Sequence, residues 1–194
     1  MSDDEDRREP EQDPEDAAEP LVMLAFGVFL YGALVIGALL WLSSRDRLGA
    51  IAELSIGARG LLAGSGVGLV VGLVGAALAD VVSRRVRDLE QLRAASERLF
   101  VRWDERVGVV FSLLAAFAEE LFFRLAVQDA WGLLAMVALC VLLHMPFGEL
   151  RWLGVVLVHA LTLGLLVEFG FGLLGATTAH AILNYLSLRR IQLS

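Results

Sequence analysis

The sequence has no lysine, a single cysteine and no glycine-rich loop of the kind that binds phosphate. All 16 basic residues are arginine, a bias that fits a GC-rich bacterial genome. Cys140 has no second cysteine to pair with, so an internal disulfide is excluded. We find no internal repeat, no nucleic-acid motif and no metal-type spacing of Cys and His. Nothing in the sequence therefore indicates a nucleotide-binding, nucleic-acid-binding or zinc-finger protein.

The first 20 residues lack the basic start and the cleavage site of a signal peptide, so we expect the first apolar segment to be an uncleaved anchor. Ten acidic residues against Arg7 and Arg8 give residues 1–20 a net charge of −8, which leaves +1 for the remainder of a chain whose total is −7. Three of the four prolines also lie here. Because this composition cannot bury a core, we predict a disordered acidic tail in the cytoplasm.

Beyond the tail, apolar residues form blocks long enough to cross a hydrocarbon core of about 30 Å. We predict an all-α, polytopic transmembrane bundle of about six spans. The proposed spans are Leu21–Leu42, Leu61–Val82, Val107–Ala130, Trp131–Phe147, Trp152–Phe169 and Gly172–Leu188. All four tryptophans lie at or beside proposed span ends, where an amphipathic ring prefers to sit. Glycines are frequent in the second span, and we expect them to permit close helix packing.

The arginines are distributed unevenly between the two sides of the predicted bundle. Twelve lie on the side that holds both termini, and the other side has Arg45, Arg47 and Arg59. By the positive-inside bias, both termini are predicted to lie in the cytoplasm, with the chain in a bacterial inner membrane. Within residues 83–106, apolar residues recur at helical spacing between charges, which predicts an amphipathic helix on the cytoplasmic membrane surface. A helical linker packed on the protein is the alternative.

Three ionisable residues lie near mid-depth of the third predicted span: Glu119, Glu120 and Arg124. A charge at that depth costs at least a few kcal/mol, so such groups are rare and usually functional. Glu120 and Arg124 are four residues apart in the order that favours an ion pair on one helix face. Glu119 points about 100° away and has no partner in its own helix. We therefore expect Glu119 to be the free carboxylate and a general base.

Other predicted spans carry His144, and His180 with Asn184 one helical turn later. In an antiparallel bundle these three side chains and Glu119 are expected to converge on one pocket between mid-membrane and the cytoplasmic face. A carboxylate base, an imidazole and an amide beside a second imidazole are the groups needed to activate water and stabilise an oxyanion. This inventory predicts peptide hydrolysis within the membrane.

Three short motifs follow one another along the chain: EELFFR (Glu119–Arg124), CVLLH (Cys140–His144) and HAILN (His180–Asn184). They resemble the EExxxR, FxxxH and HxxxN/D motifs of the CPBP family, the CAAX-protease and bacteriocin-processing intramembrane endopeptidases of glutamic type. The resemblance covers roughly residues 107–188. It implies that Glu119 and His144 activate water, that His180 and Asn184 form the oxyanion hole, and that Glu120 and Arg124 brace the site.

Two departures from the family pattern affect what the resemblance implies. Cys140 replaces the phenylalanine of the second motif, which alters the wall of the pocket more than its chemistry. Six spans are fewer than the eight typical of CAAX-processing members, so a prenylated substrate is not assumed. Members that mature secreted peptides or cut C-terminal sorting tags, as the myxosortases do, indicate a membrane-associated protein or peptide as substrate. The predicted organisation is a tail (1–20), two helices (21–82), a surface helix (83–106), a catalytic core (107–188) and a cytoplasmic C-terminus (189–194).

Alternatives remain for the function and for individual residues. Glu119 and the histidines would also suit the relay of a proton-coupled carrier, and a non-catalytic scaffold would bind a partner through the tail or the surface helix. Zinc held by Glu119, His144 and His180 is a further alternative, although no HExxH segment is present and we expect no cofactor. His159 matches no motif and is expected to be a packing histidine. Asp129 and Glu168, at outer span ends, are expected to be solvated.

Overall fold

The computed structural model describes residues 14–85, 105–145 and 150–192, and helices account for nearly all of them. The elements are α1 (Pro14–Ser44), α2 (Ala50–Ile56), α3 (Leu61–Arg85), α5 (Glu105–Glu120), η1 (Leu121–Gln128), α6 (Asp129–His144), α7 (Leu150–Glu168) and α8 (Gly172–Gln192). No strand occurs among the described residues. The prediction of an all-α protein is confirmed.

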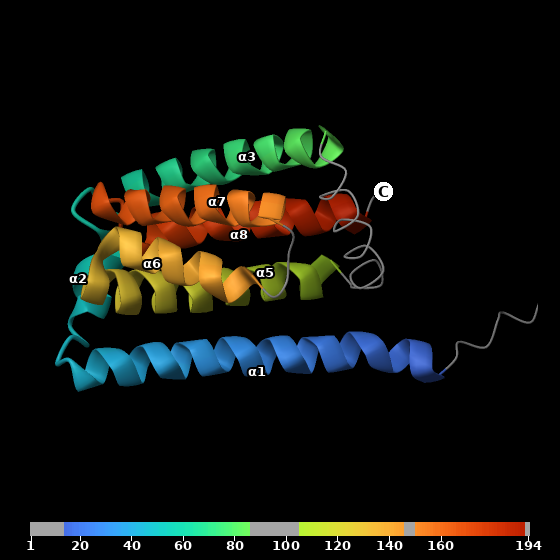
Figure 1. The fold of residues 1–194 in the computed structure, drawn as a ribbon, viewed down its shortest axis with the longest axis horizontal. Helices are drawn as coiled ribbons and strands as arrows, with labels where there is room; N and C mark the ends of the chain where they lie inside the picture. Colours follow the sequence, from blue (N-terminus) through green and yellow to red (C-terminus); the bar gives the residue numbers. More distant parts are fainter. Residues whose placement is uncertain (1–13, 86–104, 146–149, 193–194) are drawn as a thin grey trace, which may run out of the picture.

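Each of the six segments predicted as spans is helical in the structure, with ends that differ by a few residues. The third and fourth form one long apolar stretch that reverses direction at Gly132. This residue has φ 81° and ψ 172° within an otherwise helical segment, a conformation that glycine adopts without a Cβ clash. As a result α6 runs back alongside η1 (Figure 1).

Four segments are long and apolar enough to cross a membrane, which indicates a membrane protein. They are Leu24–Ser44, Leu61–Val82, Glu105–His144 and Leu150–Glu168. The third is 40 residues long and contains the reversal at Gly132. Helix α8 is not among the four, since it ends in Arg189 and Arg190 and carries several polar residues. Length and composition thus support membrane insertion without establishing six crossings.

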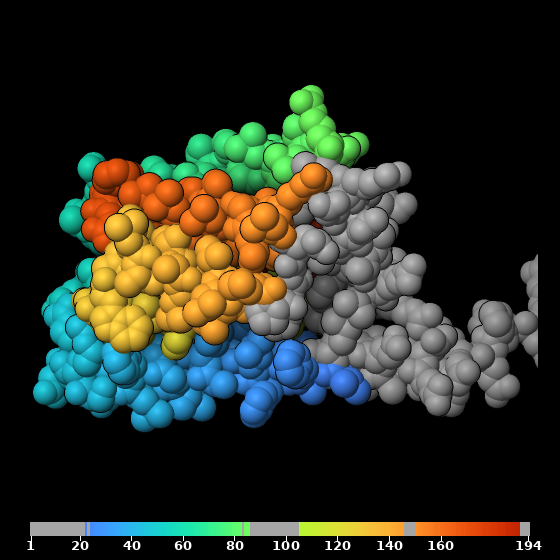
Figure 2. All heavy atoms as spheres, viewed as in Figure 1, coloured from blue at the N-terminus to red at the C-terminus, as the bar shows by residue number. Residues whose placement is uncertain are grey.

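Successive long helices run in alternating directions, and the α5–η1 unit lies at the centre of the bundle (Figure 1). Helix α1 packs on one side of this unit, while α8 packs on the other and separates it from α3. In the space-filling view, α1, α6 and α7 form most of the visible face and largely hide α5 and η1 (Figure 2). Every η1 residue except Phe122 is buried. The central position of η1 decides which side chains can meet inside the protein.

Helices α3 and α8 approach each other so closely that glycine is required on α3. A Cβ added to Gly64 would lie 2.6 Å from the carbonyl oxygen of Phe171, and one added to Gly72 would lie 2.7 Å from that of Ala179. Gly68 has an equally close neighbour in Gly175. The contacts recur every four residues in the same direction on both helices, so this is a parallel interface of small residues. The prediction that glycines of this span serve helix packing is confirmed for these three, whereas a Cβ added to Gly66 would meet nothing within 4 Å.

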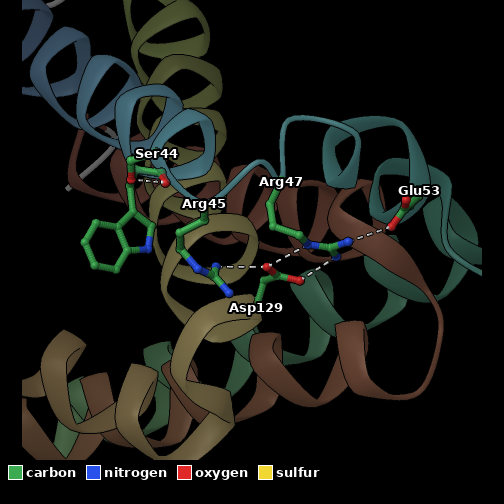
Figure 3. Close-up of polar contacts among 6 residues, drawn as sticks. Ser44, Arg45, Arg47, Glu53 and Asp129 are labelled. Carbon is green, nitrogen blue, oxygen red and sulfur yellow. Dashed lines mark hydrogen bonds and ion pairs between the residues drawn. The ribbon is translucent and has the colours of Figure 1, made fainter.

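A polar corner joins α1 and α2 to the start of α6. Asp129 accepts hydrogen bonds from Arg45 (3.1 Å) and, through both carboxylate oxygens, from Arg47 (3.3 and 2.9 Å), which also lies 3.5 Å from Glu53 (Figure 3). The hydrogen bonds to Asp129 raise the pKa of Arg47. The Asp129 side chain is only 12% exposed. The expectation of a solvated Asp129 is therefore wrong, because two arginines from the α1–α2 turn cover it.

Two further predictions about boundaries meet the structure only in part. Helix α1 begins at Pro14, so residues 14–20 are helical where a disordered tail was expected. Proline is favoured at a first helical position and acidic residues are favoured in a first turn, and the sequence that follows Pro14 begins with two acids. Residues 1–13 lie outside the described residues. The predicted surface helix at 83–106 also falls mostly outside them, since α3 ends at Arg85 and α5 begins at Glu105.

Candidate active site

Three polar side chains spaced four residues apart point into the interior of the bundle from α5 and η1. Glu120, Arg124 and Gln128 have relative exposures of 0%, 2% and 5%. Burying such groups in an apolar interior is costly unless each finds a partner. We call these three side chains the polar ladder. Its first two members belong to the EELFFR motif, and the third follows one step later.

The first step of the ladder is a buried cluster of opposite charges. The Arg124 Nε lies 2.9 Å from Oε2 of Glu120, at an angle too bent for a hydrogen bond, so the contact is an ion pair. The ion pair predicted from the spacing of four residues is therefore confirmed. The other oxygen, Oε1, lies 2.8 Å from Nδ1 of His180 on α8. An ionised carboxylate can only accept a hydrogen bond. Nδ1 of His180 therefore carries a proton and donates the hydrogen bond to Glu120.

Helix α7 provides the partners of the other ladder residues. Arg124 Nη2 donates to the carbonyl of Ala160 (3.3 Å), and Gln128 Nε2 donates to the carbonyl of Gly164 (3.1 Å) and to Glu168 Oε1 (2.8 Å). Glu168 is exposed, as expected, and it also accepts the hydrogen bond from Gln128. The partners on α7 are four residues apart as well, so the two helices run parallel and in register. A Cβ at Gly164 would clash with Cδ1 of Leu133 and lie 2.8 Å from Cε of Met136, so both side-chain ends would have to move to accommodate it.

The segment that carries Arg124 and Gln128 is a π-helix, where an ordinary α-helix was expected. Element η1 covers the last four letters of EELFFR and the following four residues. Such helices are rare and occur frequently at functional sites. The guanidinium of Arg124 also lies 5.9 Å from the ring centre of Phe123, within the range of a cation–π contact. Hydropathy gives no signal for this change of helix type.

Glu119 differs from its neighbour in every contact. Its side chain is partly buried, and within the described part of the chain it forms no hydrogen bond or ion pair. It lies within electrostatic range of Tyr31 of α1, Cys140 of α6 and His180 of α8. Glu119 therefore lies beside the cluster and keeps its carboxylate available.

Among the described residues, no hydrogen bond or ion pair joins His144 or Asn184 to Glu119. His144 is held by its own helix, with Nδ1 2.8 Å from the carbonyl oxygen of Cys140. Counted from the reversal at Gly132, Glu120 stands 12 residues before it and His144 stands 12 residues after it, so the two lie at a similar depth in the bundle. Asn184 is partly exposed one turn beyond His180, and no hydrogen bond links it to another described residue.

Sequence reasoning missed two residues that the structure places at the cluster. His159, expected to be a packing histidine, lies with its ring centre 4.8 Å from that of His180, at 76° between the ring planes. Gln128 extends the polar ladder by one step. A signal for Gln128 was present, since polar residues recur at positions 120, 124 and 128. No comparable signal marked His159, because its neighbour His180 lies in another helix.

The structure also bears on the zinc alternative. Among residues 14–85, 105–145 and 150–192, no three His, Cys, Asp or Glu side chains are grouped as they would be around a metal ion. The three residues considered as zinc ligands, Glu119, His144 and His180, do not form such a group.

Glu120 and His180 are 60 residues apart in sequence, and their hydrogen bond unites the first and third motifs in one buried cluster. Comparison of the chain with protein-family models, with curated proteins and with solved structures gave no significant match. The resemblance to CPBP endopeptidases therefore rests on the three motifs and on their order along the chain.

Proposed function

We propose that the chain is an intramembrane endopeptidase of glutamic type that cleaves a membrane-associated protein or peptide. One observation carries the proposal: the buried hydrogen bond between Glu120 and His180, with Glu119 left unpaired beside it. A buried ion cluster inside an apolar helix is costly and is retained where it serves chemistry. An unpaired carboxylate next to that cluster is suited to remove a proton from water.

In the proposed reaction, Glu119 takes a proton from a water molecule, and the resulting hydroxide attacks the carbonyl carbon of the scissile peptide bond. His180 then stabilises the oxyanion through Nε2, since its Nδ1 proton is directed at Glu120. Donation from Nε2 requires a doubly protonated ring, and the Glu120 carboxylate stabilises that cation. The tetrahedral intermediate then collapses and its C–N bond breaks. The proton held by Glu119 passes to the leaving amine, which returns Glu119 to its starting state.

His144 and Asn184 enter the proposal with the roles that the motifs imply. His144 assists Glu119 in activating water, and Asn184 adds an amide donor to the oxyanion site. Asn184 lies one helical turn nearer than His180 to the end of the bundle where α8 finishes and where the C-terminus lies, and α6 ends at His144 after running toward the same end. We place water entry and the substrate on that side, which the arginine distribution assigns to the cytoplasm. The topology proposed with this is six crossings of a bacterial inner membrane, with both termini cytoplasmic.

The test is the variant Glu119→Ala, compared with the parent by mass spectrometry of membrane and secreted proteins. Peptide ends that are present with the parent should disappear in the variant, while the amount of the protein in the membrane stays the same. Glu119→Gln, which keeps the shape of the side chain and removes the base, is the matched variant and should behave like Ala. If the peptide ends were unchanged in both variants, the proposal would be wrong and a scaffold would be the better description.

A proton-coupled carrier is the second candidate, and the polar ladder argues against it. The buried groups that follow Glu120 toward the outer end of the bundle are Arg124 and Gln128. An arginine does not release its proton in a protein, and an amide carries none to exchange, so this path does not relay protons. A carrier would lose transport in Glu119→Ala without any change in the length of another protein.

A further inference from the structure

His159 of α7 makes an aromatic contact with His180 that the proposed mechanism does not use. The ring centres are 4.8 Å apart and the planes are inclined by 76°, which is an edge-to-face arrangement. The next residue, Ala160, accepts the hydrogen bond from Arg124. One turn of α7 therefore touches both groups that flank the Glu120 carboxylate.

The hydrogen bond to Glu120 holds Nδ1 of His180, and a second restraint is needed to set the plane of the ring. Rotations about the Cα–Cβ and Cβ–Cγ bonds of His180 can combine so that the ring tilts while the 2.8 Å contact to Oε1 of Glu120 is kept. A tilt moves Nε2, on the far side of the ring, by more than it moves Nδ1. A flat ring placed edge-to-face against His180 opposes this tilt, since aromatic pairs prefer such arrangements.

We infer that His159 is a positioning residue, which holds the imidazole plane of His180 so that Nε2 faces the reacting carbonyl. The inference rests on the proposed function for its catalytic consequence and on the ring geometry for the restraint itself. His159 touches His180 and acts through it. The restraint needs a flat ring at position 159 and does not need the imidazole nitrogens.

The experiment is nuclear magnetic resonance of the full chain in lipid nanodiscs with ¹⁵N-labelled histidine. The chain has three histidines, so single substitutions assign each ring. In the parent, His180 should give one sharp set of ring ¹⁵N signals, with a proton on Nδ1. In His159→Leu, which puts a side chain without a ring at this position, the Nε2 signal of His180 should shift and broaden, while the Nδ1 signal, still held by Glu120, should change less. In His159→Phe they should stay as in the parent.

Val158→Ala is the matched control, because Val158 is adjacent on α7 and 64% exposed. It should leave the His180 signals unchanged. If His159→Leu also left them unchanged, or if His159→Phe disturbed them as much as Leu did, the inference would be overturned. His159→Ala, which removes more of the side chain, repeats the comparison if the Leu variant does not accumulate.

A processing assay separates this inference from the proposed function. Where the peptide ends that depend on Glu119 are found, His159→Leu should lower the turnover rate about tenfold and leave the Michaelis constant nearly unchanged, and His159→Phe should restore most of the rate. A packing role would give Leu the activity of Phe. If no peptide end depends on Glu119 while the resonance result holds, the proteolytic function fails and the restraint on His180 stands.

Discussion

At the scale of single residues, the central feature is a carboxylate that serves two partners. Glu120 is fully buried, and its two oxygens contact Arg124 and His180 separately. Removal of either partner leaves a charge in an apolar interior, where the effective penalty is several kcal/mol. The two adjacent glutamates of the motif are thus distinct in environment: one is enclosed and paired, and the other is partly exposed and free.

This difference predicts opposite outcomes for neighbouring substitutions. Arg124→Ala and Glu120→Ala should each destabilise the protein by about 3–5 kcal/mol, since each strands a buried charge. Glu119→Ala should change stability little. The measurement is the thermal unfolding midpoint of the three variants in detergent, together with the amount of each in the membrane. Normal accumulation and an unchanged midpoint for Arg124→Ala would contradict the assignment of a bracing role.

The sequence was sufficient for contacts within one helix and insufficient for contacts between helices. Spacing predicted the Glu120–Arg124 ion pair because both residues share a helix face. It did not predict that Glu120 would bond His180 or that His159 would lie against His180, because those contacts depend on the rotation of three helices about their axes. The catalytic roles of Glu119, His144, His180 and Asn184 stay predictions until variants are assayed.

At the scale of elements, the parallel α3–α8 interface depends on the absence of side chains at particular positions. Gly72→Val should destabilise the bundle by about 1–3 kcal/mol, because its side chain would push against the Ala179 carbonyl oxygen, 2.7 Å from the added Cβ. Gly66→Val is the matched control on the same helix, since nothing lies within 4 Å of its added Cβ. Both variants are compared by thermal unfolding in detergent. Equal losses would show that helix propensity, and not the interface, sets the cost.

Apolar blocks were enough to locate the long helices, and they did not predict the short helix α2 or the π-helical form of η1. Hydropathy responds to the mean polarity of a window, so it found every long helix of the described part of the chain and missed α2, which has seven residues. A hydropathy average contains no information on which backbone groups are hydrogen-bonded to each other, so the π-helical form of η1 was not expected. The glycine-rich composition of the second span did indicate close packing, because small residues have few other uses at a helix interface.

At the scale of the whole molecule, the proposed six crossings put both termini on one side of the membrane. A chain with Cys140 replaced by alanine can carry a single cysteine at Arg59 or at the C-terminus. A membrane-impermeant maleimide applied from outside should label the cysteine at position 59 and leave the C-terminal one unlabelled until the membrane is opened. Labelling of both positions from outside would mean that α8 does not cross.

The polar corner around Asp129 should hold the α1–α2 turn against the rest of the bundle. Asp129→Asn is expected to lower the unfolding midpoint by less than Arg124→Ala does, because the two arginines that lose their partner are 31% and 38% exposed and can be solvated. Hydrogen exchange should increase in the α1–α2 turn and little elsewhere. Glu53→Gln, which alters a carboxylate that is 61% exposed, is the control and should leave exchange in the turn unchanged.

Composition and periodicity predicted the class of the molecule and left its interior arrangement open. An apolar helical protein with an ionisable centre followed from the blocks and from three charged residues within one of them. Which helix stands at the centre, and which pairs run parallel, depends on side-chain shapes that a linear pattern does not contain. The buried position of η1 between α1, α6, α7 and α8 is therefore a result of the structure.

The glycine stripe of α3 has a consequence for how the chain is made. Its partner on α8 lies 107 residues downstream, as Gly72 and Ala179 show. A ribosome that adds about 5–20 residues per second needs roughly 5–20 s to deliver that partner after α3 has emerged. During this interval the glycine face of α3 has no α8 to pack against. Biogenesis thus ends with the docking of α8, and that same event brings His180 to Glu120.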